Sequence, residues 1–80
     1  MRIPWDISGR QLARLLEVYG YTITRQVGSR LRLTTLHTGE HHITFPDHKD
    51  LRVGTFNSIL SDVADHLKVN RDILIADIFK

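Results

Sequence analysis

Residues 20–35 read Gly-Tyr-Thr-Ile-Thr-Arg-Gln-Val-Gly-Ser-Arg-Leu-Arg-Leu-Thr-Thr. Two short β-prone runs with alternating apolar and polar residues flank the pair Gly28-Ser29, a pattern typical of a β-hairpin with a short turn. The pattern predicts one strand over residues 21–27 and a second over residues 30–35. We expect this hairpin to carry the functional surface of the protein.

Alternation along the hairpin separates an inner from an outer face, because successive side chains of a strand point to opposite sides. The inner positions are apolar: Tyr21, Ile23, Val27, Leu31 and Leu33. Arg25 falls on this apolar register, so the first strand is expected to twist or bulge there.

A third strand is expected over residues 40–45, after a loop over residues 36–39. Ile43 and Phe45 occupy its inner positions, and Pro46 follows them. Proline has no backbone N–H to donate to a strand partner, so the strand is expected to end there.

A helix is predicted over residues 9–19, before the hairpin. Ser8 fits the N-cap, and Gln11 lies at the spacing of a capping box. Gly20 lies where a helix commonly ends in a left-handed residue. Trp5 precedes the cap, and we expect it to pack at the domain edge rather than stack on a base.

Two further helices are predicted after the third strand. A polar connection over residues 46–54 leads to Thr55 as the expected cap. The apolar residues that follow have uninterrupted helical spacing: Phe56, Ile59, Leu60, Val63, Ala64 and Leu67. Asn70 is the expected cap of a last helix over residues 71–79, with apolar positions Leu74, Ile75, Ile78 and Phe79.

The predicted order is α-β-β-β-α-α, an α+β fold with a three-stranded antiparallel sheet that helices cover on one face. The other face would be open to water. Its expected side chains are polar: Thr22, Thr24, Gln26, Arg30, Arg32, Thr34, His42 and Thr44. Because none is phenylalanine, tyrosine or tryptophan, contacts to an RNA backbone and its 2′-hydroxyls are favoured over base stacking.

Charge is distributed unevenly along the 80 residues, although the net charge is only +2. Residues 1–32 contain six arginines against two carboxylates, whereas residues 33–80 contain five cations against seven carboxylates. Arginine suits two-pronged phosphate contacts, so an anionic partner is expected on the N-terminal half. The chain has no cysteine and no apolar run long enough to span a bilayer, and we expect a cytoplasmic protein in one domain over residues 1–80.

Several segments in order resemble the HicA (YcfA-like) toxins of type II toxin–antitoxin systems. The resemblance covers about residues 8–69 and rests on the first helix and these motifs: Gly20-Tyr21, Arg25-Gln26-Val27-Gly28-Ser29, His42-Ile43-Thr44-Phe45-Pro46, Leu51-Arg52-Val53-Gly54-Thr55 and Ile59-Leu60. The resemblance implies a fold like that of double-stranded-RNA-binding domains, here with an additional C-terminal helix. It also implies mRNA cleavage without a metal or cofactor, and neutralisation by a HicB-like antitoxin.

The chain departs from the family at the turn. The family pattern is Gly-Ser-His, with the histidine catalytic, whereas this turn reads Gly28-Ser29-Arg30. Arginine keeps its proton and cannot act as a base, although it can clamp a phosphate. We therefore expect cleavage to be impaired or absent at Arg30. Such a chain could arise by natural decay of the catalytic position, or as an altered copy selected because the active toxin kills its host.

The candidate RNA contacts lie on the hairpin and are Thr22, Thr24, Arg25, Ser29, Arg30 and Arg32. His42 is expected on the same open face as Arg30 and is the other candidate for acid–base chemistry. A metal site is not expected, because His41 and His42 are adjacent on one strand and would point to opposite faces.

Three interpretations remain open at this level. The chain could be a HicA-type toxin with an altered catalytic position, a non-catalytic binder of single-stranded RNA on the same fold, or a module that binds an antitoxin. Cleavage on restoring histidine at position 30 separates the first from the second. Loss of RNA binding with antitoxin binding intact on Arg30→Glu would assign the two ligands to different surfaces.

Overall fold

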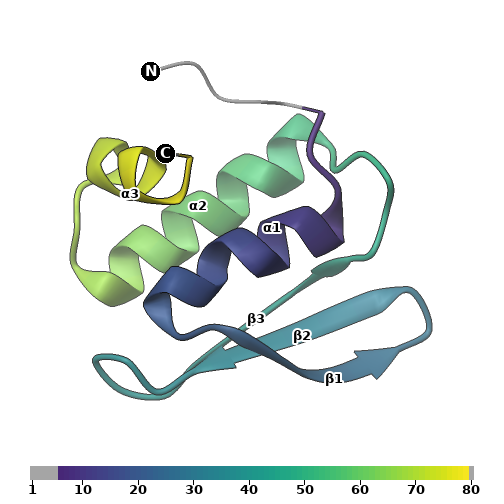
Figure 1. Ribbon diagram of the computed structural model, residues 1–80, viewed down its shortest axis with the longest axis horizontal. Helices are drawn as coiled ribbons and strands as arrows, with labels where there is room; N and C mark the ends of the chain where they lie inside the picture. The colour runs from purple at the N-terminus through teal and green to yellow at the C-terminus, as the bar shows by residue number, and fades with distance from the viewer. Residues whose placement is uncertain (1–5, 80) are drawn as a thin grey trace.

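The computed structural model describes residues 6–79, and its elements follow the predicted order (Figure 1). They are α1 (Gly9–Leu15), the 3₁₀-helix η1 (Leu16–Tyr19), β1 (Thr22–Val27), β2 (Arg30–Thr35), β3 (His41–Pro46), α2 (Val53–Leu67) and α3 (Arg71–Ile78). The predicted α+β class is confirmed. The predicted strand over residues 40–45 is shifted by one residue, because Pro46 still pairs with Arg30.

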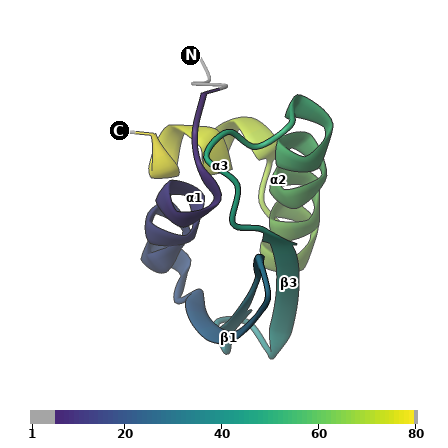
Figure 2. The ribbon, with the colours of Figure 1, turned by 90° about the vertical axis from the view of Figure 1, so that its right-hand side faces the viewer.

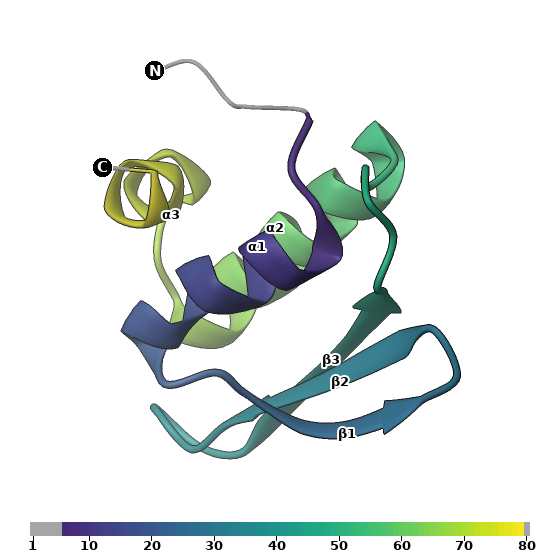
Figure 3. The same ribbon diagram turned by 45° about the vertical axis from the view of Figure 1, so that its right-hand side comes forward.

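The three strands form one antiparallel sheet in the order β1-β2-β3. Helices α1 and α2 lie side by side on one face of this sheet, and α3 lies across them on the side away from the strands (Figures 1 and 2). No described element covers the opposite face (Figure 3). The predicted arrangement, a sheet with helices on one face only, is therefore confirmed, and we call the uncovered side the open face.

The core lies between the sheet and the helices. All six apolar positions predicted for the second helix are buried, as are the inward residues of β2 and β3: Leu31, Leu33, Ile43 and Phe45. Helix α3 adds Leu74, Ile75 and Ile78 to this cluster, and Phe79 packs against it. Burial of these apolar surfaces is the main force that holds the helices on the sheet.

Local rules place the first helix as expected. The Gln11 backbone N–H donates to Ser8 Oγ at 3.1 Å, and the Ser8 backbone N–H donates to Gln11 Oε1 at 2.8 Å. Gly20 ends the segment in the left-handed conformation, with a φ of 82°. Gly9 contacts the end of β3, since an added Cβ would lie 2.4 Å from the Pro46 carbonyl oxygen. A glycine at position 9 thus lets α1 start directly against β3.

Strand β1 differs from the prediction. Its residues are all exposed, including Ile23 at 42% and Val27 at 61%, and only Tyr21 before the strand is buried. A bulge between Ile23 and Arg25 shifts the pairing, so Arg25 lies opposite Arg32 and Val27 opposite Arg30. Residues directly opposite in an antiparallel pair share a face. Val27 is therefore on the open face, and the prediction that it points inward is wrong.

The same bulge moves Gln26 to the helix side. Gln26 lies opposite the buried Leu31, and its Oε1 accepts a hydrogen bond of 2.9 Å from Arg10 of α1. Arg10 also donates through Nε to Asp47 Oδ2 at 3.0 Å. The prediction of Gln26 on the open face is therefore wrong, because the extra residue in β1 inverts the alternation after it.

One predicted helix cap is also wrong. Helix α2 begins at Val53 with Arg52 at the N-cap and no side-chain cap, so Thr55 lies inside the helix. Asn70 does cap α3, since its Oδ1 accepts from the Asp72 backbone N–H at 2.7 Å. The expected packing of Trp5 concerns a residue outside the described range.

Candidate nucleic-acid interface

Three arginines converge at one end of the open face. Arg25 lies directly opposite Arg32 across β1 and β2, and Arg30 lies two residues from Arg32 along β2. With Val27 and Thr44 they line a hollow of about 230 Å³. We call these three residues the arginine cluster. The structure brings together the three cations that the sequence suggested for phosphate contacts.

The lining of this hollow carries positive charge and no negative charge that would neutralise it. All three arginines are exposed, and the five lining residues include no carboxylate. Like charges opposite each other on neighbouring strands destabilise a sheet. An anion held between the guanidinium groups would remove that repulsion, and the fork geometry of arginine matches phosphate oxygens.

Hydroxyl groups occupy the middle of the open face. Thr22 lies opposite Thr34, and the hydroxyls of Thr24 and Thr34 are 2.9 Å apart. Ser29 lies in the exposed turn between β1 and β2, directly before Arg30. Its carbonyl accepts a hydrogen bond from the Asp47 backbone N–H. Of the hydroxyl residues predicted as RNA contacts, Thr22 and Thr24 are thus near each other, and Ser29 lies at the far end of the hairpin.

His42 lies on the open face but away from Arg30. It pairs with Thr34, four residues along β2 from Arg30, a separation of about 13 Å in an extended strand. Its Nε2 is 2.8 Å from Glu40 Oε2, and its Nδ1 is 2.8 Å from Thr34 Oγ1. The two candidate catalytic positions therefore belong to different parts of the face. Sequence reasoning missed Glu40, although its spacing of two residues from His42 is a detectable strand pattern.

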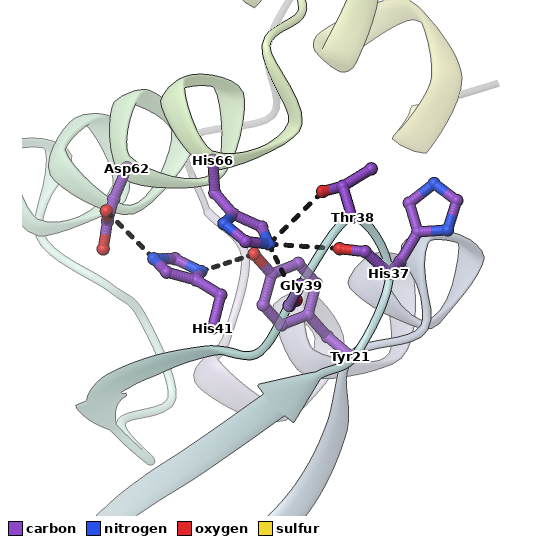
Figure 4. A network of polar contacts seen from close by, with 7 residues as sticks. All are labelled: Tyr21, His37, Thr38, Gly39, His41, Asp62 and His66. Carbon is purple, nitrogen blue, oxygen red and sulfur yellow. Dashed lines mark hydrogen bonds and ion pairs between the residues drawn. The ribbon is translucent and has the colours of Figure 1, made fainter.

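His41 points to the helix side and joins a separate polar network (Figure 4). Its Nδ1 is 2.7 Å from the Tyr21 hydroxyl, and its Nε2 is 3.3 Å from Asp62 Oδ1 on α2. Its ring stacks on His66 with centroids 4.3 Å apart. His66 Nε2 in turn lies 3.1 Å from the His37 carbonyl oxygen. The network fixes the β2–β3 loop to α2.

The structure places His41 and His42 on opposite sides of the sheet, as the strand alternation predicted. Within residues 6–79, no group of three histidine, aspartate or glutamate side chains is arranged to hold a metal ion. In the same range, no helix has the length and apolar character needed to cross a membrane.

The buried phenol of Tyr21 makes folding sensitive to alkaline pH. Burial, helped by the negative charge of Asp62, raises the pKa of Tyr21 to about 12. Burial and the hydrogen bond to Asp77 raise the pKa of Tyr19 to about 12 as well. Between pH 10 and 12 the unfolded chain loses phenolic protons that the folded chain retains, so stability falls as pH rises.

We therefore expect Tyr21→Phe to flatten the alkaline part of the stability profile. Over this pH range, Tyr21 is expected to lower the free energy of unfolding of the parent protein by about 1–3 kcal/mol. The variant has no phenol at position 21, so its free energy of unfolding falls only through Tyr19. At neutral pH the variant is less stable by about 1 kcal/mol, because the hydrogen bond to His41 is gone. Urea unfolding at pH 8 to 11.5 measures both effects, and an equal alkaline decline in the two proteins would contradict the assignment.

Similarity to known proteins is found for residues 9–64, which include the helix α1, the sheet and most of α2. No curated protein and no solved structure matches the chain. The family model described as "HicA toxin of bacterial toxin-antitoxin" matches residues 9–64, from the start of α1 into α2. This match covers well over half of the 80 residues and includes the hairpin, the open face and the arginine cluster. The chain therefore belongs to the HicA toxin family of bacterial toxin–antitoxin systems.

Proposed function

We propose that this protein binds single-stranded RNA through the open face, as a toxin-type domain whose histidine-dependent cleavage at position 30 is lost. The observation that carries the proposal is the carboxylate-free arginine cluster. The resemblance to the family implies that Arg30 stands where a catalytic histidine is usual. RNA cleavage without a metal requires a group that takes the proton of the 2′-hydroxyl and one that protonates the leaving oxygen. Arg30 supplies charge and hydrogen bonds but no proton acceptor.

The open face suits an RNA backbone better than stacked bases. Within the described strands this face carries no phenylalanine, tyrosine or tryptophan, so it lacks the broad platform that holds several splayed bases. The arginine cluster would hold phosphates, and the hydroxyls of Thr22, Thr24 and Thr34 would contact ribose 2′-hydroxyls. An mRNA strand lying along the hairpin would meet both kinds of group.

The partner in this proposal is a HicB-like antitoxin in the bacterial cytoplasm. The family description pairs the toxin with an antitoxin, and strand β1 offers a site for one. It is an edge strand, exposed along its whole length, with Ile23 and Val27 uncovered. Edge strands with unpaired backbone groups accept an added strand from a partner chain. This favours antitoxin capture as the second function, on a surface that borders the arginine cluster.

Salt dependence of RNA binding tests the first function. For a single-stranded oligoribonucleotide, three phosphate contacts give a slope of about −2 in log affinity against log salt concentration. Arg32→Gln is expected to reduce the slope by about 0.7 and the affinity about tenfold or more. Fluorescence anisotropy over a series of KCl concentrations measures both.

The matched control is Arg14→Gln, which removes the same charge from an exposed position of α1, on the helix side of the sheet. It is expected to leave the slope unchanged. If the parent protein does not bind RNA, or if both variants weaken binding equally, the proposed use of the open face is wrong.

A further inference from the structure

A chain of hydrogen bonds crosses the open face from β3 to β1, away from Arg30. It runs from Glu40 to His42, then to Thr34 and Thr24, with separations of 2.8, 2.8 and 2.9 Å. The side chains come from all three strands, because Thr34 pairs with His42 on one side and with Thr22, next to the bulge, on the other. Because of the bulge, Thr24 also lies beside Thr34 on the open face.

The chemistry of the groups gives these hydrogen bonds a direction. An ionised carboxylate only accepts, so His42 Nε2 carries a proton and donates it to Glu40. In the neutral ring that a general base requires, Nδ1 is then the acceptor and takes the hydrogen bond of the Thr34 hydroxyl. In that arrangement Thr34 Oγ1 accepts at 2.9 Å from the Thr24 hydroxyl, which also lies at the longer distance of 3.4 Å from the Arg32 carbonyl oxygen, and Thr34 Oγ1 keeps one lone pair free. A basic nitrogen is thus linked to a hydroxyl that faces solvent, and its ring is oriented by a carboxylate.

The nearest cation on this face is Arg32. It lies two residues before Thr34 on the same side of β2, about 7 Å away along the strand. In RNA the 2′-hydroxyl lies on the sugar that carries the adjacent 3′-phosphate. A phosphodiester on the Arg32 guanidinium would therefore place its own ribose hydroxyl near Thr34, within reach of the His42 chain.

We propose that His42 is the general base of an RNA cleavage centre that does not use position 30, with Arg32 on the phosphate and Glu40 as the positioning residue. The proposal rests on the RNA binding proposed above. The ribose O2′ forms a bond to phosphorus, and its proton passes through the Thr34 hydroxyl to His42 Nδ1. The bond from phosphorus to O5′ breaks, and O5′ takes a proton from water at the open face. The products are a 2′,3′-cyclic phosphate and a 5′-hydroxyl end.

The arrangement predicts slow turnover. His42 is a positioned base, but the leaving oxygen depends on water rather than on a second side chain. A positioned base is typically worth about 10²–10⁴-fold in rate. His42→Ala is accordingly expected to lower cleavage at least about a hundredfold, with RNA affinity retained. Because the His42 side chain is 37% exposed, imidazole added to the variant has access to the vacated position and restores part of the rate.

The test follows cleavage of a labelled single-stranded oligoribonucleotide in parallel with its binding. The parent is expected to give cyclic-phosphate ends slowly, and a 2′-deoxy substitution at the cut position abolishes the product. His42→Ala loses the activity and regains part of it with imidazole, whereas Glu40→Gln lowers kcat about tenfold with KM unchanged. The control His37→Ala removes an exposed imidazole from the β2–β3 loop and leaves the rate unchanged.

Failure of this inference differs from failure of RNA binding. A parent that binds RNA but yields no cyclic-phosphate product overturns the role of His42 and leaves the arginine cluster as a binding site. Retention of the parental rate in His42→Ala, or absence of imidazole rescue, overturns it as well. A parent that does not bind the oligoribonucleotide overturns both proposals.

Discussion

In a His42→Ala background, replacing Arg30 with histidine is expected to raise the rate of RNA cleavage by about 10²- to 10⁴-fold. The substitution supplies a side chain that exchanges a proton near neutral pH, at the position where the resemblance to the family implies a catalytic histidine. Arg25 and Arg32, the proposed phosphate contacts, remain in place, and position 30 is exposed and lines the same hollow. The exchange needs no repacking, because no buried side chain is altered.

The measurement is cleavage of a labelled oligoribonucleotide, together with growth of a bacterial host that expresses the variant. Arg30→Lys is the matched control, because lysine keeps the charge but cannot take up a proton at neutral pH. Both variants are also made with His42→Ala, so that any contribution of the second histidine is subtracted. If Arg30→His cleaves no faster than Arg30→Lys, position 30 is not the catalytic position in this chain.

Local rules explain why so much of the fold could be predicted. Ser8 and Gln11 form their capping box through neighbouring backbone groups, and the apolar stripe of α2 repeats with the helical period. Such patterns depend on residues a few positions apart, so tertiary packing does not alter the elements that they predict. The left-handed Gly20 at the end of the first helical segment is likewise predictable from the local sequence.

The hairpin shows where local rules stop. Its bulge adds one residue to β1, and a bulge at Arg25 was expected, but its consequence for every later side chain depends on the pairing with β2. A shift of one residue inverts the faces of a strand. Val27 and Gln26 consequently exchange sides relative to the simple alternation. The same shift brings Arg25 opposite Arg32, so the arginine cluster is a product of tertiary pairing.

The site chemistry divides in the same way. Opposite orientations of His41 and His42 follow from strand alternation alone and were predicted. The hydrogen bonds of His42 to Thr34, and of His41 to Tyr21, join residues that are 8 and 20 positions apart. Only the register of the sheet and its packing on α1 and α2 decide such partners. The position of Glu40 next to His42 could have been derived from their spacing, whereas the 13 Å between His42 and Arg30 required the strand pairing.

Reversing two charges of the arginine cluster is expected to lower RNA affinity by about 10²- to 10⁴-fold. Arg25→Glu with Arg32→Glu removes two charge-assisted phosphate contacts, each worth about 1.5–3 kcal/mol, and adds repulsion of the backbone. The fold is expected to persist, because both side chains are exposed and the change exchanges one pair of opposed like charges for another. Thermal unfolding checks this, and anisotropy with the labelled oligoribonucleotide gives the affinity.

The control double variant is Arg14→Glu with Lys49→Glu, two exposed cations outside the open face. Each double variant changes the net charge by the same amount, from +2 to −2. Long-range attraction of RNA responds to net charge, so it weakens equally in both proteins. Binding at a specific site depends on the positions of the charges, so only the cluster variant is expected to lose RNA affinity by orders of magnitude. Equal losses in the two proteins would mean that RNA is held by overall charge, and the hollow between β1 and β2 would have no specific role.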